Sequence, residues 1–119
     1  ALPDFARNLD RLSSMVRRRL TIENDENIYT PADSLPICKT TGIPLVYDVH
    51  HHRCNPDGMS IERATENALA TWNREQLFHI SSPLEGWNRP KPESRHDFID
   101  VTDFPSYWQR KKIKVEVEA

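Results

Sequence analysis

Residues 43–52 read Ile-Pro-Leu-Val-Tyr-Asp-Val-His-His-His, and this stretch decides the fold. The apolar run 43–47 carries β-branched and aromatic residues, which is typical of a strand in the core of a sheet. Asp48 and the histidines follow the carboxyl end of that strand, where ligands gather in α/β folds. Because carboxylate and neutral imidazole together suit zinc, manganese or iron, the Asp-x-x-His spacing of Asp48 and His51 predicts a metal site. Packing or solvent exposure of individual histidines is the alternative.

Helical patterns separate this strand from three further strand candidates. The predicted strands cover residues 20–22, 44–48, 77–80 and 113–118. Helices are predicted over residues 4–18, from Pro31 to a stop at Gly42, over 61–72, and within 98–108 with an interruption at Pro105. Thr30 and Ser60 are the predicted caps of the second and third of these helices. Strands that alternate with helices predict βα units around a parallel sheet.

An ionisable residue stands at the end of every predicted strand. These residues are Glu23, Asp48, His79 and Glu118. In a parallel sheet all four would lie at the same edge, which is where a TIM barrel keeps its chemistry. The sequence therefore predicts that the four side chains meet.

Four strands are half of an eight-stranded barrel, which usually needs about 250 residues. We therefore predict an α/β fold, with residues 1–119 forming a single partial TIM-barrel domain of about four βα units. It would be the carboxyl-terminal half of a barrel, truncated at both ends. An open four-stranded parallel sheet is the structural alternative. The exposed edges of either form would favour self-association of the fragment.

Composition excludes some classes of function. No apolar run approaches the roughly 20 residues that span a bilayer, so no membrane partner is expected. The net charge of −2 does not indicate a nucleic-acid binder, and the basic runs 17–19 and 110–112 are interpreted as solvated helix ends or strand entries.

Two cysteines without a CxxC spacing fit a reduced, intracellular setting. Trp87 and Trp108 could stack on bases.

Two kinds of metal chemistry fit the residues at the strand ends. Several carboxylates could hold two or three cations that hydrolyse a phosphodiester, or one divalent ion could polarise a sugar carbonyl. The ligand types do not distinguish phosphodiester hydrolysis from polarisation of a sugar carbonyl. A nuclease, a sugar isomerase or epimerase, and a non-catalytic half-barrel module are therefore the candidate functions.

Six short motifs, in order along nearly the whole chain, resemble the UV damage endonucleases. They comprise residues 21–25, 29–31, 35–38, 42–48 with the three histidines, 79–83 and 117–119. The resemblance implies a TIM barrel that nicks damaged double-stranded DNA on the 5′ side of ultraviolet photoproducts and abasic sites. It also implies a multi-metal, manganese-type cluster, with Mg²⁺, Co²⁺ or Zn²⁺ as alternatives.

Carried over residue by residue, the resemblance implies a ligand set for this cluster. The implied ligands are Glu23, Asp48, His51, His79, His96 and Glu118. All of these except His96 are also expected to act in catalysis, through the bound metals. His50 and His52 would then have structural or supporting roles.

The chain departs from the family at two points. The first departure is Leu77, two residues before the histidine of the His-Ile-Ser-Ser-Pro motif. Similar sequences have a lysine at this position. In the family this lysine can be modified and lie at the metals. The amino-terminal half of the barrel, with the remaining ligands and the residues that probe the damaged strand, would be a missing partner. The fragment alone is therefore expected to be inactive, and the complete enzyme is expected inside the cell, in the cytoplasm or nucleoid of a prokaryote or in the nucleus of a eukaryote.

Overall fold

A computed structural model describes residues 2–118 of the chain, so Ala1 and Ala119, the ends of the predicted domain, lie outside the described residues. The elements follow in the order α1 (Leu2–Leu9), α2 (Ser14–Arg17), β1 (Ile22–Glu23), α3 (Pro31–Thr41), β2 (Leu45–Val46), α4 (Val49–Cys54), α5 (Ile61–Leu69), β3 (Phe78–Ile80), the 3-10 helices η1 (Val101–Asp103) and η2 (Ser106–Trp108), and β4 (Val115–Val117). All four predicted strands are present, and the fold is α/β as predicted.

The four strands are parallel and lie side by side in chain order. β1 pairs with β2, and β3 pairs with β4. A parallel bridge between Asp48 and His79 joins the two pairs just beyond β2, where the His79 N–H donates to the Tyr47 carbonyl at 3.0 Å. The carboxyl ends of all four strands therefore meet at one edge.

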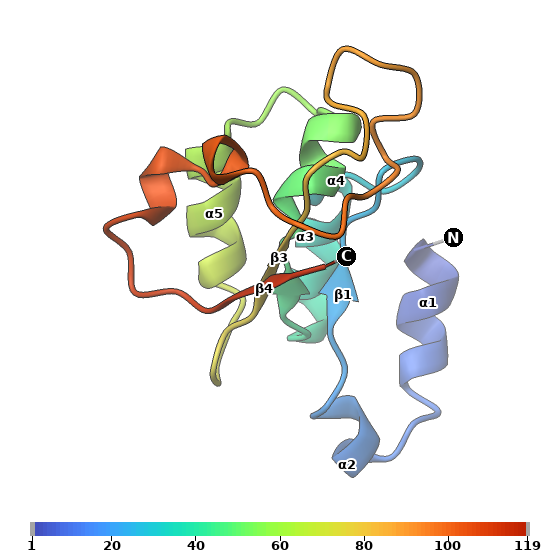
Figure 1. Cartoon of the computed structure of the whole chain (residues 1–119). Coiled ribbons are helices and arrows are strands. Elements are labelled where there is room, and N and C mark those ends of the chain that lie inside the picture. Colours follow the sequence, from blue (N-terminus) through green and yellow to red (C-terminus); the bar gives the residue numbers. More distant parts are fainter. Residues whose placement is uncertain (1, 119) are drawn as a thin grey trace.

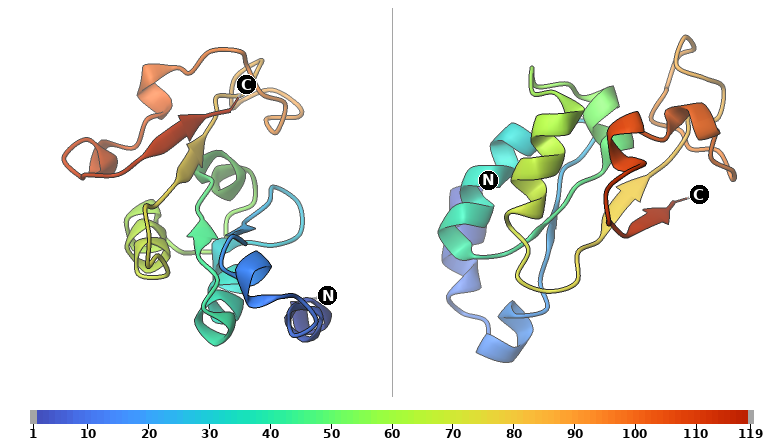
Figure 2. Two further views of the ribbon diagram at one scale, coloured as in Figure 1. Left: turned by 90° about the horizontal axis from the view of Figure 1, so that it is seen from below. Right: turned by 90° about the vertical axis from the view of Figure 1, so that its left-hand side faces the viewer.

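Helices cover one side of these strands, and the hydrophobic core lies between them (Figures 1 and 2). Phe78 and Ile80 of β3 are buried in this core. Because strand side chains alternate between the two faces, His79 lies on the opposite face. The other core residues come from β2 and the helices around it: Cys38, Leu45, Tyr47, Val49, Ala64, Ala68 and Trp108.

The predicted caps of α3 and α5 are confirmed. The Thr30 hydroxyl accepts the Asp33 N–H at 3.2 Å, and Asp33 accepts the Thr30 N–H in return, which forms a capping box. At the other end of α3, Gly42 adopts a left-handed conformation with φ 76°, which glycine takes at no steric cost. Ser60 caps α5 by accepting the Arg63 N–H at 3.1 Å.

Two predicted helices were too long. The helix expected over residues 4–18 is broken into α1 and α2, because the Ser13 hydroxyl accepts the Val16 N–H at 3.2 Å and begins a new helix. The helix expected over residues 61–72 ends at Leu69. Beyond it, the Thr71 hydroxyl accepts the Leu45 N–H at 2.8 Å, and this bond ties the turn to β2.

The possibility that Trp108 stacks on bases is wrong. Trp108 is only 1% exposed, and its Nε1–H donates to the Thr65 hydroxyl at 2.8 Å inside the core. Trp87 lies in the long loop after β3 and donates to an Asp103 carboxylate oxygen at 2.9 Å. Both cysteines are free, and within residues 2–118 no helix has the length and apolar character to cross a membrane.

Candidate metal centre

Four side chains from the four strands meet on the face away from the helices. They are Glu23, Asp48, His79 and Glu118, and each offers a ligand atom that lies within 4.8 Å of the other three. The alternation of strand side chains explains this placement, because the neighbours Ile22, Tyr47, Phe78 and Ile80 face the core instead. His79 was predicted at a strand end but lies in the middle of β3.

His79 lies between two carboxylates. Its Nδ1 is 3.0 Å from Glu23 Oε1 and 3.1 Å from Glu118 Oε1. The other oxygen of Glu118 accepts a charge-assisted hydrogen bond from Arg95 Nη1 at 2.7 Å. The Arg95 contact therefore fixes Glu118 with one oxygen turned toward His79.

Asp48 is completely buried and holds one oxygen free. Its Oδ1 accepts the His51 N–H at 2.9 Å and so caps helix α4, while Oδ2 has no hydrogen-bond partner in the described part of the chain. Asn24 pins the backbone of Asp48 from both sides: its Nδ2 donates to the Asp48 carbonyl at 3.0 Å, and its Oδ1 accepts the Asp48 N–H at 2.9 Å. Asp48 is therefore rigidly placed with Oδ2 available to a ligand.

The charges in the cluster perturb one another. Burial raises the pKa of Asp48 to about 6, and the nearby Glu23 and Glu118 carboxylates add to the rise. Contact with Glu23 raises the pKa of His79 although burial opposes it. Burial likewise works against ionisation of Glu23, but His79 and His51 together hold the pKa of Glu23 below its ordinary value.

His51 lies beside the cluster rather than within it. Its Nδ1 is 2.8 Å from the Asn24 carbonyl and 3.4 Å from Glu23 Oε2. Its Nε2 points toward Glu26 Oε2 at 3.3 Å. Asn24 and Glu26 were not among the predicted site residues. Both stand in the polar run that begins with Glu23 at the end of β1, and this run is the signal that could have found them.

The other histidines lie outside the four-residue cluster. His50 is buried, with Nδ1 3.2 Å from the Ser81 carbonyl, and burial lowers its pKa. His52 is bound between the Tyr47 hydroxyl and Asp57, with Nε2 2.8 Å from the carboxylate. His96 lies in the loop after β3, where its Nδ1 accepts the Phe98 N–H at 3.1 Å.

Leu77 immediately precedes β3, two residues before His79. The two-residue period of a strand places it on the same face as His79, whereas Phe78 faces the core. The position therefore borders the cluster, and an aliphatic side chain there offers no ligand atom.

The residues present fit a divalent cation. Two buried polar atoms in the cluster, Asp48 Oδ2 and His79 Nδ1, make no well-aligned hydrogen bond among residues 2–118, although two carboxylate oxygens lie 3.0 and 3.1 Å from His79 Nδ1. Buried polar atoms are normally paired, so each of them requires a partner. Three carboxylates and one imidazole form an oxygen-rich ligand set that suits manganese or magnesium and also accepts zinc.

Comparison with known proteins gives consistent matches. The family model described as UV-endonuclease UvdE matches residues 1–119. The chain is 40% identical over 110 residues to the UV DNA damage endonuclease of Deinococcus radiodurans, covering 87% of this chain and 34% of that protein. It is 38% identical over 105 residues to the UV DNA damage endonuclease of Bacillus velezensis, covering 85% of this chain and 32% of that protein.

A solved structure agrees with these sequence matches. The crystal structure of SacUVDE is 26% identical in sequence and superposes with a TM-score of 0.82, covering 98% of this chain and 40% of that one. The chain spans about a third of the length of the two curated relatives.

Proposed function

Because the chain belongs to the UV-endonuclease UvdE family, we propose that it supplies part of a metal-dependent DNA repair endonuclease. The whole protein would nick double-stranded DNA on the 5′ side of ultraviolet photoproducts and abasic sites. The names of the relatives support the ultraviolet-damage part of this proposal. A DNA substrate further implies that the enzyme acts inside the cell, in the cytoplasm or nucleoid of a prokaryote or in the nucleus of a eukaryote.

The observation that carries the proposal is the convergence of Glu23, Asp48, His79 and Glu118, in which the buried Asp48 Oδ2 makes no hydrogen bond within the described residues. Divalent ions held there, manganese first and magnesium, cobalt or zinc as alternatives, would supply a hydroxide nucleophile and stabilise the charge of phosphodiester hydrolysis. We propose His51 and His96 as additional ligands. Three carboxylates suit more than one cation, since negative charge offsets the repulsion between neighbouring ions.

Glu23 is the residue best placed to bridge two metal positions. Its Oε1 faces His79 at 3.0 Å, while its Oε2 faces His51 at 3.4 Å. A carboxylate whose two oxygens face two different imidazoles can serve two neighbouring sites at once. We therefore assign Glu23 the bridging role, and we assign Asn24 the positioning of Asp48.

We propose that residues 1–119 are one domain and the carboxyl-terminal part of a TIM barrel. Four consecutive parallel strands with helices on one side support this assignment. Within residues 2–118, β1 and β4 each have one strand neighbour, so each offers an open edge. The remaining barrel strands would cover these edges, and in their absence two copies of the fragment would associate through them.

We further propose that these residues alone do not nick DNA. These four strands supply ligands from one side of a barrel only, whereas the active site of a complete barrel is built from the ends of several of its eight strands. Leu77 removes one further ligand position at the border of the cluster. Metal binding by this chain is accordingly expected to be weaker than metal binding by the whole enzyme.

The test is a nicking assay on ultraviolet-irradiated plasmid, combined with metal analysis of the full-length protein. We expect metal-dependent nicking of irradiated plasmid and no nicking of undamaged plasmid. Bound metal without nicking would contradict the proposal and favour the sugar isomerase alternative. A folded protein with neither bound metal nor nicking would favour a non-catalytic module.

A further inference from the structure

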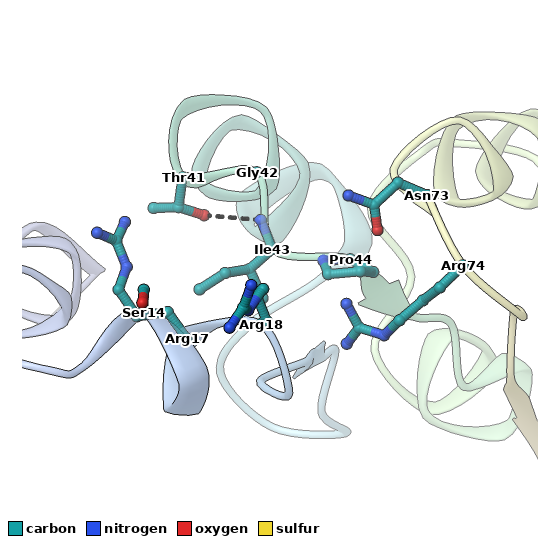
Figure 3. A pocket seen from close by; sticks show the side chains of 9 residues that line it. All are labelled: Ser14, Arg17, Arg18, Thr41, Gly42, Ile43, Pro44, Asn73 and Arg74. Atoms are coloured by element: carbon teal, nitrogen blue, oxygen red, sulfur yellow. Dashed lines mark hydrogen bonds between the residues drawn. The ribbon is translucent and has the colours of Figure 1, made fainter.

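A pocket of about 450 Å³ lies between α2, the residues before β2 and the turn before β3 (Figure 3). Its walls come from α2, from the segment between α3 and β2, and from the turn that precedes β3. Arg18 extends from the first of these segments toward Pro44, as do Asn73 and Arg74 from the last, whereas Arg17 lines the pocket at its far side with its guanidinium turned away from these three. Arg17 and Arg18 belong to the basic run 17–19, which the sequence pattern predicts to be a solvated helix end or strand entry.

The topology separates this pocket from the metal centre. Pro44 immediately precedes β2, and the Arg74 Nη2 donates to the carbonyl of Leu20, which precedes β1, at 3.0 Å. The pocket therefore borders the amino ends of the strands, whereas Glu23 and Glu118 stand at the carboxyl ends. In Figure 1, α2 accordingly lies at the bottom of the molecule, away from the loops that follow β1 and β3. A ligand in this pocket is independent of the proposed nuclease chemistry.

The pocket is strongly positive. Three arginines, Arg17, Arg18 and Arg74, are among the lining residues, and no carboxylate is. Within the described residues, none of Arg17, Arg18 and Arg74 has a carboxylate partner within 4 Å, in contrast to Arg95 with its partner Glu118. The carboxyl end of α3 contributes about half a negative charge at most, which cannot neutralise three cations.

One of the three guanidinium groups is already held in place. Arg74 is fixed by its bond to the Leu20 carbonyl and by the Trp72 ring, whose centroid lies 5.6 Å from the guanidinium carbon. Its remaining N–H groups are left for a ligand, because guanidinium carries five donors in a rigid fork. The Asn73 amide extends from the same turn toward the pocket. Fixed donors lose little entropy when they bind an anion.

We propose that this pocket binds a phosphate-bearing anion. Phosphate oxygens accept paired hydrogen bonds from guanidinium groups, and a phosphate would bring the negative charge that the three arginines lack. The volume exceeds that of one phosphate ion and leaves room for a small group esterified to it. Free phosphate and a nucleoside monophosphate share this chemistry.

Isothermal titration calorimetry of the purified, metal-free protein at low ionic strength tests the proposal. Inorganic phosphate and adenosine monophosphate are titrated separately. Metal is removed beforehand so that phosphate cannot bind to metal ions at the carboxylate cluster. We expect saturable binding of phosphate at one site. Tighter binding of the monophosphate would identify an ester as the ligand, and equal or weaker binding would identify the free ion.

Arginine variants on neighbouring positions make the test specific. Arg17→Gln combined with Arg18→Gln should weaken phosphate binding at least about tenfold, because charge-assisted hydrogen bonds are lost. Arg19→Gln is the matched control, since Arg19 is exposed in the same segment but does not line the pocket. Its affinity should stay within twofold of wild type. Absence of saturable binding, or an equal loss in the control, would overturn the proposal.

Discussion

Replacement of Asp48 by asparagine should stabilise the metal-free protein and abolish its response to metal. Burial raises the pKa of Asp48 from the ordinary 3.8 to about 6, so the folded state resists ionisation of this carboxyl. The unfolded chain ionises it near pH 4. The raised pKa therefore does not affect the unfolding free energy below pH 4. It lowers the unfolding free energy progressively between pH 4 and 6, and by its full amount at pH 7.

The size of this effect follows from the same pKa. A rise from 3.8 to about 6 corresponds to about 3 kcal/mol of unfolding free energy at pH 7. Asparagine keeps the acceptor for the His51 N–H and is as good an N-cap as aspartate. The variant loses the attraction between Asp48 and His79, which reduces the gain. We therefore expect Asp48→Asn to raise the unfolding free energy by about 1–3 kcal/mol at pH 7.

Urea denaturation at several pH values, with and without manganese, measures both parts of the prediction. A ligand present at a hundred times its dissociation constant adds about 2.7 kcal/mol to the wild type, and this addition should vanish in Asp48→Asn. Asp57→Asn is the control, because hydrogen bonds from Ala32, His52 and Met59 hold the pKa of Asp57 below its ordinary value although burial opposes them. This variant should be destabilised at pH 7 and should keep its response to manganese.

Two results would refute the reasoning about Asp48. The first is a metal-free Asp48→Asn protein that is less stable than wild type at pH 7. The second is an equal gain in stability from manganese in the variant and the wild type. A difference between the two proteins that stays constant from pH 4 to pH 7 would show that ionisation of the carboxyl is not its cause.

Three further changes test other parts of the structure. Glu23→Gln in the full-length enzyme should abolish nicking of irradiated plasmid. Glu75→Gln changes an exposed side chain and should leave nicking intact. Nicking by the Glu23→Gln variant would exclude the bridging role of Glu23. Glu26→Gln should weaken manganese binding by about tenfold in calorimetry, because Glu26 faces His51 Nε2, and unchanged affinity would remove Glu26 from the site. Trp108→Ala should lower the unfolding free energy by about 3–5 kcal/mol in urea denaturation, since it empties a buried core position; a loss below 1 kcal/mol would contradict the packing.

The strand pattern was the part of the fold that local sequence could predict. β-branched and aromatic runs marked all four strands, and the caps Thr30 and Ser60 marked two helix starts. These signals depend on residues a few positions apart, so the sequence alone carries them. The meeting of Glu23 and Glu118 followed from the parallel topology, because strands in one direction share a carboxyl edge.

Features that depend on tertiary contacts were not predictable in the same way. The turn that follows the early end of α5 is tied to the Leu45 N–H by the Thr71 hydroxyl, 26 residues away in the chain. The break between α1 and α2 comes instead from a local cap at Ser13, which the helical spacing of apolar residues across it concealed. Burial of Trp108 depends on Thr65, which lies 43 residues away and satisfies its N–H. No local pattern could distinguish this tryptophan from one that stacks on a ligand.

The spacing of Asp48 and His51 has two physical meanings, and the structure contains both. Asp-x-x-His at a strand end is a metal-ligand spacing, but it is also the spacing between an N-cap and the third residue of a helix. Asp48 uses Oδ1 to cap α4 through the His51 N–H and leaves Oδ2 to the cluster. The cap thereby places the His51 ring above the cluster edge, next to Glu23. One carboxylate can start the helix and serve the site because its two oxygens have separate partners, so asparagine should preserve α4 while it removes a ligand.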